Sequence, residues 1–403
     1  MPANSLLLLS NQLVFNLGFY MVVPFLAVYL REDMALTGSA IGLVLGLRTF
    51  SQQGLFVFGG ALSDRLGPRR LILLGCIVRV AGYAFLGLGG HIATILIGAC
   101  LTGVGGALFS PALSTLIAKV GETSEKAGKR SRAQYFALLG VWGELGAVLG
   151  PVAGALLLGV GFQAMAFIGA GVFVCAFFVL LAFLPRDEAR PVRHEQGSFA
   201  PVLGDRLFLT FILAHGAYLF CYNQLYLALP IEIARSGGGE RDLAPMFMIA
   251  SVLVITLQLP ITRLARHVGV QVSMPFGFAL MAVAFAIVAV LAPLTPATAP
   301  WSLAPAVIMV VILSLGQMIV RPLAMDLVPT FAAGRPTGVY YGALASVGGV
   351  FVLVGNVVLG PLLDWALIPS ARASVPWIVL ALVPAISAFA MLAVTRRLTS
   401  HKS

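Results

Sequence analysis

Residues 162–184 read FQAMAFIGAGVFVCAFFVLLAFL, without a single acidic or basic side chain. A helix needs roughly 20 mostly apolar residues to cross a membrane, so this run predicts a membrane span. Comparable runs recur along the 403-residue chain. We therefore predict an all-α membrane protein with about twelve spans, at 5–30, 38–62, 71–90, 92–118, 134–159, 162–184, 206–234, 243–265, 273–292, 303–325, 338–363 and 375–395.

Composition supports this interpretation and excludes other classes. The chain is 60% hydrophobic and 10% charged, whereas soluble domains carry roughly 25% charged residues. A soluble protein of this size needs more charged residues than that on its water-exposed surface. We therefore expect most of the surface to face lipid. The net charge of +10 sits in short loops between the apolar runs and does not predict nucleic-acid binding. The four cysteines lie inside apolar runs, in a pattern that suggests neither a disulfide framework nor a metal site.

The predicted spans form two halves of six. A charged stretch from 185 to 205 separates them, which predicts an N-terminal bundle at 1–185, a cytoplasmic linker at 186–205 and a C-terminal bundle at 206–403. The halves also echo each other, since Leu149-Gly150-Pro151 has a counterpart in Leu359-Gly360-Pro361. Repeated halves that meet at a central cavity are the architecture of secondary transporters.

The distribution of lysine and arginine predicts the orientation. With a cytoplasmic amino terminus, the inside loops receive Arg65, Arg69, Arg70, Lys119, Lys126, Lys129, Arg130, Arg132, Arg186, Arg190, Arg193, Arg206, Arg263, Arg266, Arg321, Arg335, Arg396, Arg397 and Lys402. The outside loops receive Arg31, Arg235, Arg241 and Arg372. We therefore expect both termini in the cytoplasm.

Two motifs carry a family resemblance. The loop after the second span reads Gly60-Ala-Leu-Ser-Asp64-Arg65-Leu-Gly67-Pro-Arg69-Arg70, and span five carries Gly146-Ala-Val-Leu-Gly150-Pro151-Val-Ala-Gly154. The first resembles the signature loop of the major facilitator superfamily and the second resembles its antiporter motif. Three further stretches make the chain similar to the multidrug-resistance branch called MdtH: Leu45-Gly46-Leu47-Arg48, Gln52-Gln53-Gly54 and Gly105-Gly106. An arginine common in span four of drug antiporters is absent.

Each motif has a physical interpretation beside the resemblance. Gly67 permits a tight turn, and Asp64 at the end of span two could face the amino terminus of span eleven, a pairing of ~0.3–1 kcal/mol. That contact would latch a gate formed by Gly60, Asp64, Arg65, Gly67, Arg69 and Arg70. The alternative is a basic loop that only sets topology. Glycines 146, 150 and 154 share one helix face, which favours either a seam between the halves or ordinary close packing of helices.

Three charges lie deep in the predicted spans: Arg48, Arg79 and Glu144. Arg48 and Glu144 each stand about ten residues from one end of their span, or roughly 15 Å at 1.5 Å per residue. A charge at that depth usually faces a cavity or another charge and serves function. Glu144 is the candidate proton carrier, with Arg48 and Arg79 as its modulators. The alternative is a static Arg–Glu pair.

Polar and aromatic side chains within the spans are candidates for the substrate site. Span seven carries a stripe at spacings of three, four and four, with Asn223 beside it: His215, Tyr218, Tyr222 and Tyr226. Rings with polar tips suit an amphipathic or cationic ligand, although an interfacial aromatic belt is an alternative. Further candidates are Asn11, Phe15, Asn16, Arg48, Gln52 and Gln317.

The resemblance implies a proton-coupled exporter of small amphipathic compounds in the bacterial inner membrane, driven by the proton gradient without a cofactor. We expect a monomer whose partners are a small-molecule substrate, protons and membrane lipids, and not nucleic acid. The pattern of an enzyme is missing, since no HExxH, GxSxG or phosphate-loop sequence occurs. Export of a siderophore or another secreted metabolite is an alternative, and an importer or facilitator is less favoured.

Overall fold

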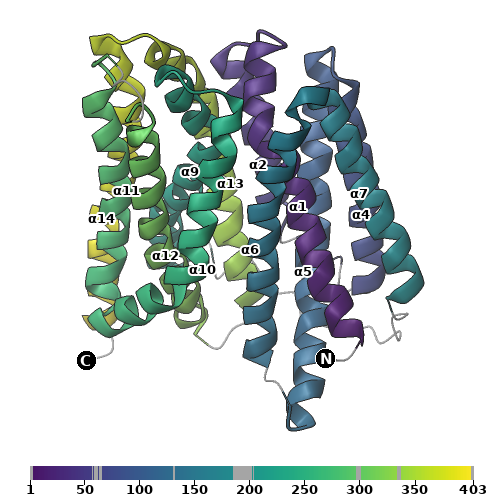
Figure 1. Cartoon of the computed structure of the whole chain (residues 1–403). Coiled ribbons are helices and arrows are strands. Elements are labelled where there is room, and N and C mark those ends of the chain that lie inside the picture. The colour runs from purple at the N-terminus through teal and green to yellow at the C-terminus, as the bar shows by residue number, and fades with distance from the viewer. Residues whose placement is uncertain are drawn as a thin grey trace. The chain divides into compact units, whose positions relative to one another are not determined.

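A computed structural model describes residues 3–56, 58, 62, 66–129, 132–184, 202, 204–295, 301–333 and 337–400. This part of the chain is helical throughout and contains no strand (Figure 1). Its α-helices are α1 (Ala3–Glu32), α2 (Gly38–Gln53), α4 (Pro68–Leu88), α5 (Ile92–Lys126), α6 (Arg132–Leu157), α7 (Phe162–Phe183), α9 (Arg206–Arg235), α10 (Leu243–Val268), α11 (Val270–Leu291), α12 (Ala304–Ala332), α13 (Thr337–Leu363) and α14 (Val375–Ser400). The short 3₁₀ helices are Leu158–Val160, Glu240–Asp242, Asp364–Leu367 and Ala371–Ser374.

Ten of these helices are long and apolar enough to cross a membrane. The described part of α2 has 16 residues and is too short to qualify. Helix α9 has 30 residues, but side chains such as His215, Asn223 and Gln224 lower its mean hydropathy. The all-α membrane fold predicted from the sequence is therefore confirmed.

The helix ends differ from the predicted ones where polar residues extend a helix or a turn interrupts it. Helix α5 continues to Lys126, because hydropathy marks the apolar part of a helix and not its full length. Helix α12 continues past Asp326, which follows the predicted end at 325, to Ala332. Helix α2 ends at Gln53, before the predicted boundary at 62. A turn follows at Gly54, whose backbone N–H donates to the carbonyl of Phe50 at 2.7 Å.

By its internal contacts the chain divides into two compact units. Unit 1 comprises Met1–Leu26 and Leu47–Gln196, and unit 2 comprises Ala27–Gly46 and Gly197–Ser403. Helices α1 and α2 therefore each contribute to both units. The predicted linker at 186–205 lies mostly outside the described residues, so the predicted domain boundaries stay a prediction.

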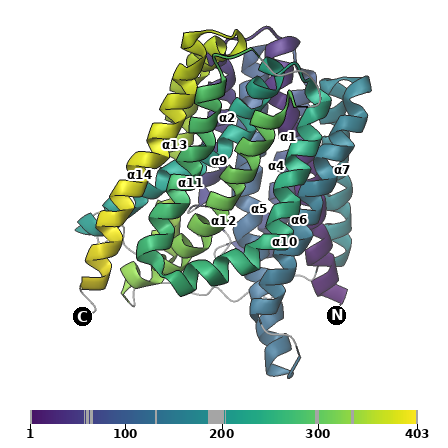
Figure 2. The same cartoon turned by 60° about the vertical axis from the view of Figure 1, so that its left-hand side comes forward.

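Each unit is a bundle of closely packed helices. In unit 1, α4 packs against α5 and α7, and α5 packs against α6 (Figure 1). In unit 2, α11 packs against α12 and α14, α9 against α13, and α10 against α12 (Figure 2). Asp205 caps the first turn of α9, because its carboxylate accepts from the backbone N–H groups of Leu207 at 3.0 Å and Phe208 at 2.9 Å.

Glycines allow some of these helices to touch backbone to backbone. In unit 1, a Cβ on Gly146 would meet the carbonyl oxygen of Leu13, and one on Gly154 would meet that of Met21, so α6 lies directly on α1. Gly150 faces Tyr20 in the same way. This face of α6 is thus closely packed on the part of α1 that lies in unit 1. The predicted role of these glycines as a seam between the halves stays a prediction.

Candidate functional site

The first part of the candidate site is a face of α1 that carries two arginine side chains. Phe15 and Phe19 stand four residues apart and so lie on consecutive turns of one face. The guanidinium carbon of Arg79 on α4 lies 3.6 Å from the ring centre of Phe15. That of Arg48 on α2 lies 4.4 Å from the ring centre of Phe19. Both deep arginines predicted from the sequence therefore converge on α1 within unit 1.

Arg79 occupies an aromatic enclosure and is only 1% exposed. Its guanidinium carbon also lies 5.2 Å from the ring centre of Phe173 on α7, and that ring stacks on Tyr83. Nε and Nη1 have no hydrogen-bond partner among the described residues. Cation–π contacts contribute ~2 kcal/mol each when desolvated, while the effective penalty for burying an ion is several kcal/mol. The aromatic rings therefore offset much of this cost, but Nε and Nη1 remain without a hydrogen-bond partner among the described residues.

Arg48 is linked to Arg79 through Gln52. Arg48 is 5% exposed, and its Nη2 donates to Oε1 of Gln52, one helical turn away, at 2.6 Å. A Cβ on Gly106 would lie 3.0 Å from Nη2 of Arg79 and 3.1 Å from the side-chain amide carbon of Gln52, so these two side chains are neighbours. We call Arg48, Gln52 and Arg79 the arginine cluster. Gly105 and Gly106 of α5 leave the room that Arg79 fills.

Glu144 stands midway along α6 and is half-buried. The adjacent carbonyl, that of Gly143, accepts from Nδ2 of Asn16 at 2.9 Å. Oδ1 of Asn16 in turn accepts from Nε2 of Gln12 at 3.3 Å. These bonds join α1 to α6 beside Glu144. The role of Glu144 as proton carrier remains a prediction, as does its modulation by Arg48 and Arg79.

The span-seven stripe lies on α9 in unit 2 and divides into two environments. His215 is buried and stacks on Phe211 and Tyr218, with ring centres 5.9 and 5.2 Å apart. Its Nδ1 has no hydrogen-bond partner in the described structure. Tyr218 and Tyr222 are half-exposed, and Tyr222 meets Tyr226 edge to face. Of this stripe, the two half-exposed tyrosines are the accessible members.

The remaining polar candidates are buried, and one of them forms a hydrogen bond within its own helix. Nδ2 of Asn223 donates to the carbonyl of Leu219 within α9 at 3.1 Å. Asn11 and Gln317 are 6% and 9% exposed, and their amide nitrogens lack a partner among the described residues. These two amides lie in different units, Asn11 in unit 1 and Gln317 in unit 2.

Sequence reasoning missed two buried polar contacts in unit 2. Nε2 of Gln224, which is fully buried, donates to Oδ1 of Asn356 at 3.2 Å and so joins α9 to α13. Arg235 was predicted in an outside loop, but it lies in the last turn of α9, 6% exposed, and forms an ion pair with Glu232 at 2.6 Å. The i,i+3 spacing of these opposite charges was the available signal.

The predicted gating motif lies partly outside the described residues, which exclude Gly60, Asp64 and Arg65. Gly67 has φ of +85°, a conformation that favours glycine, and it precedes Pro68 at the first position of α4. Nη2 of Arg69 donates to the carbonyl of Leu181, close to the end of α7, at 2.8 Å. Arg70 is exposed. The predicted latch at Asp64 stays a prediction.

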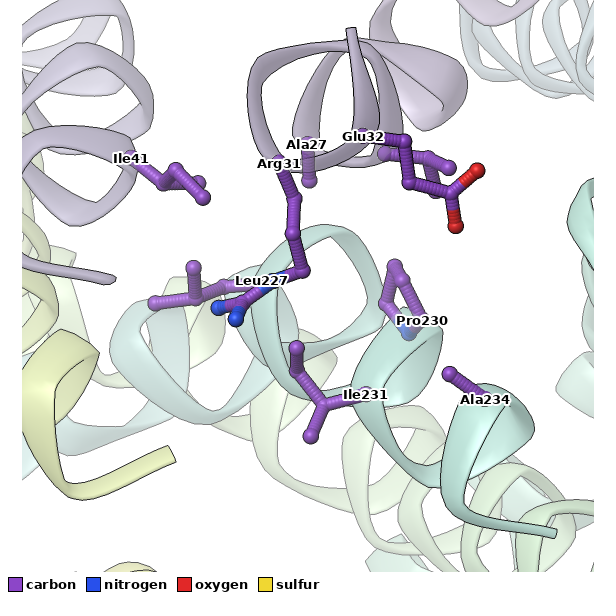
Figure 3. A pocket seen from close by; sticks show the side chains of 9 residues that line it. Ala27, Arg31, Glu32, Ile41, Leu227, Pro230, Ile231 and Ala234 are labelled. Carbon is purple, nitrogen blue, oxygen red and sulfur yellow. The ribbon is translucent and has the colours of Figure 1, made fainter. Parts of the chain in front are cut away.

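A small cavity lies in unit 2 where the end of α1 meets α9. Figure 3 shows Arg31 reaching toward Leu227 while the Glu32 carboxylate points away from it. The cavity is lined by Ala27, Val28, Arg31, Glu32, Ile41, Leu227, Pro230, Ile231 and Ala234. Its volume of about 20 Å³ is room for about one water molecule. Arg31 itself pairs with Asp364 at 2.8 Å.

Comparison with known proteins identifies the family. The model of the Major Facilitator Superfamily matches residues 8–353. The chain belongs to the major facilitator superfamily. Among relatives of this superfamily member, an uncharacterized MFS-type transporter of Mycobacterium tuberculosis is 35% identical over 90% of this chain and 86% of that protein. The multidrug resistance protein MdtH of Aeromonas hydrophila is 30% identical over 93% of this chain and 90% of its own length. The resemblance to MdtH is thereby confirmed.

Solved structures support the fold of the superfamily. The nucleoside transporter NupG aligns with a TM-score of 0.75 over 97% of this chain and 99% of that chain, at 13% identity. A POT family transporter in complex with 5-aminolevulinic acid aligns with a TM-score of 0.79 over 99% of this chain and 97% of that chain, at 12% identity. This chain is therefore a multi-pass membrane transporter of small molecules and not an enzyme.

Proposed function

We propose that this transporter is a proton-coupled exporter of small amphipathic compounds, which works by alternating access in the bacterial inner membrane with both termini in the cytoplasm. The observation that carries the proposal is the similarity to proteins named multidrug resistance protein MdtH over more than nine-tenths of the chain. The glycine-proline sequence of span five, which resembles the antiporter motif, favours export over import. The two predicted six-helix halves would rock against each other, so that the substrate site opens first to one side of the membrane and then to the other.

The proton gradient is sufficient as the energy source. One proton that moves inward releases about 2.3 kcal/mol per 100 mV and about 1.4 kcal/mol per pH unit. Together these hold a neutral substrate at a gradient on the order of several hundredfold. Coupling requires a group that takes a proton from one side and releases it to the other. We assign this role to Glu144, because the residue is half-buried and stands midway along α6.

Transport in proteoliposomes under an imposed pH gradient, with a small panel of lipophilic compounds, tests this proposal. We expect Glu144→Gln to abolish uphill transport while downhill exchange of substrate survives. Glu144→Asp should retain part of the activity with a shifted pH optimum. Glu122→Gln is the matched control, because Glu122 is an exposed glutamate paired with Lys126 at the end of α5. If the Glu144→Gln protein still concentrates substrate, this glutamate is structural.

Export of a siderophore or another secreted metabolite is the second candidate function. Two arginines buried in unit 1 favour it, since they suit an anionic or hydroxamate-like ligand at least as well as a cationic drug. The same proteoliposomes separate the two functions when the panel includes a hydroxamate siderophore beside cationic dyes. Uphill transport of the siderophore with no transport of the dyes would support the second function.

A further inference from the structure

The strongest unexplained feature of unit 1 is a cation that the described structure does not neutralise. Arg79 is 1% exposed, and its neighbours include the faces of Phe15 and Phe173. Among the described residues it forms no ion pair, and two of its three guanidinium nitrogens have no hydrogen-bond acceptor. Burying a charge is costly unless the charge is paired and hydrogen-bonded. This guanidinium therefore offers unused donors for an acceptor that carries negative charge.

A second cation raises the positive potential at the same place. Arg48 stacks on Phe19, one turn along α1 from Phe15, and Gln52 bonds to it while neighbouring Nη2 of Arg79. Gln52 is half-exposed, whereas both arginines are buried. The accessible side of the arginine cluster is therefore the side on which Gln52 lies. Planar guanidinium groups bind carboxylates through paired N–H donors, which an ammonium group cannot do.

We propose that the arginine cluster is an anion-binding subsite, which takes a carboxylate or another monoanionic group of the transported compound. The aromatic rings of Phe15 and Phe19 hold the two guanidinium groups in place for this contact. The inference rests on the proposed transport function and names the class of substrate: an organic monoanion with an apolar body. A purely structural Arg79, held by its aromatic enclosure, would give no binding of anions.

Binding of radiolabelled benzoate to the purified full chain in lipid nanodiscs tests the proposal. Benzoate is a monoanion with an apolar ring, benzamide is its neutral isostere, and benzylamine is the matched cation. We expect saturable benzoate binding that neither benzamide nor benzylamine displaces. Titrating chloride against bound benzoate distinguishes a site for an inorganic ion from a site for an organic one. A site that chloride saturates and that organic anions cannot enter would overturn the proposal, as would the absence of benzoate binding.

Variants localise the binding. Arg48→Gln and Arg79→Gln should each weaken benzoate binding ~10- to 100-fold, the usual effect of losing hydrogen bonds to a charged group. Arg79→Lys keeps the charge but not the paired donors and should bind with intermediate affinity. Arg266→Gln is the control, because Arg266 is an exposed arginine of unit 2 paired with Asp326. Benzoate affinity unchanged in both glutamine variants would overturn the assignment.

Gln52→Glu keeps the proposal falsifiable if an arginine variant fails to fold. The new carboxylate would take the place of the amide oxygen that lies 2.6 Å from Nη2 of Arg48. The protein itself would then provide the negative charge that we assign to the substrate. We expect this variant to unfold at a higher temperature and to lose benzoate binding. Retained benzoate binding would overturn the proposal. Uphill transport without benzoate binding would reject the anion site and leave the exporter proposal standing. Benzoate binding without uphill transport of any compound would reject the exporter proposal and leave the anion site standing.

Discussion

The ion pair between Glu232 and Arg235 makes a sharp prediction about stability. The two side chains are 0% and 2% exposed. Nη2 and Nε of Arg235 donate to the two carboxylate oxygens at 2.6 and 2.9 Å, and Oγ of Ser236 lies 3.4 Å from Oε1. Arg235→Met would remove both charge-assisted hydrogen bonds and leave a buried carboxylate. Breaking such a pair from one side costs ~3–5 kcal/mol of unfolding free energy.

The double variant Glu232→Leu, Arg235→Met separates the pair from the packing around it. Apolar side chains of similar volume often replace a buried ion pair with little or no loss of stability. We therefore expect the double variant to recover most of what Arg235→Met loses. The exposed pair of Arg266 and Asp326, with side chains 58% and 49% exposed, provides the control. Arg266→Met should cost ~1 kcal/mol or less, since exposed pairs contribute little.

Unfolding of the purified protein in mixed micelles, followed by helical circular dichroism as denaturing detergent is titrated, measures these differences. Each variant is compared with the unmodified chain in the same micelle composition. The reasoning is refuted if Arg235→Met and Arg266→Met lose the same stability. It is also refuted if the double variant is less stable than Arg235→Met alone, because the carboxylate would then not be the source of the cost.

Three further predictions follow from backbone geometry and charge distribution. Gly154→Val should prevent α6 from lying on α1 and reduce the yield of monodisperse protein in size-exclusion chromatography, whereas Gly140→Ala, which meets no atom within 4 Å, should not. Gly67→Ala should lower the unfolding midpoint by an amount equivalent to ~1–3 kcal/mol, because φ of +85° with ψ of 144° is a conformation that side chains other than glycine rarely adopt. In a cysteine-free background, His194→Cys and Ser400→Cys should resist labelling from the periplasm of intact cells; ready labelling would reverse the predicted orientation.

The fold was predictable because its strongest signal is local. A run such as 162–184 must be a helix in lipid, since each backbone polar group has to be satisfied within its own segment. The described helix α7, Phe162–Phe183, agrees with that run to one residue. Ends that leave the apolar region were not predictable in this way, as at Lys126, because a helix can continue in water after its hydropathy has fallen.

For the candidate site too, local spacing was predictable and contacts between distant segments were not. The spacing of Arg48 and Gln52 places them one turn apart on any helix, and their hydrogen bond realises that spacing. The depth of Arg79 was likewise readable from its position in an apolar run. No local pattern could show that its guanidinium lies on Phe15, which is 64 positions earlier in the sequence.

The amino-acid sequence by itself determined that this protein is a helical membrane protein, and it marked which charges lie within the spans. Those properties depend on hydropathy and helical periodicity, which act over one span at a time. The tertiary structure decided that two arginines from α2 and α4 share one face of α1, and that Arg235 turns inward to Glu232. Both outcomes depend on which helix faces pack together, because a buried charge takes its partners from the segments that surround it.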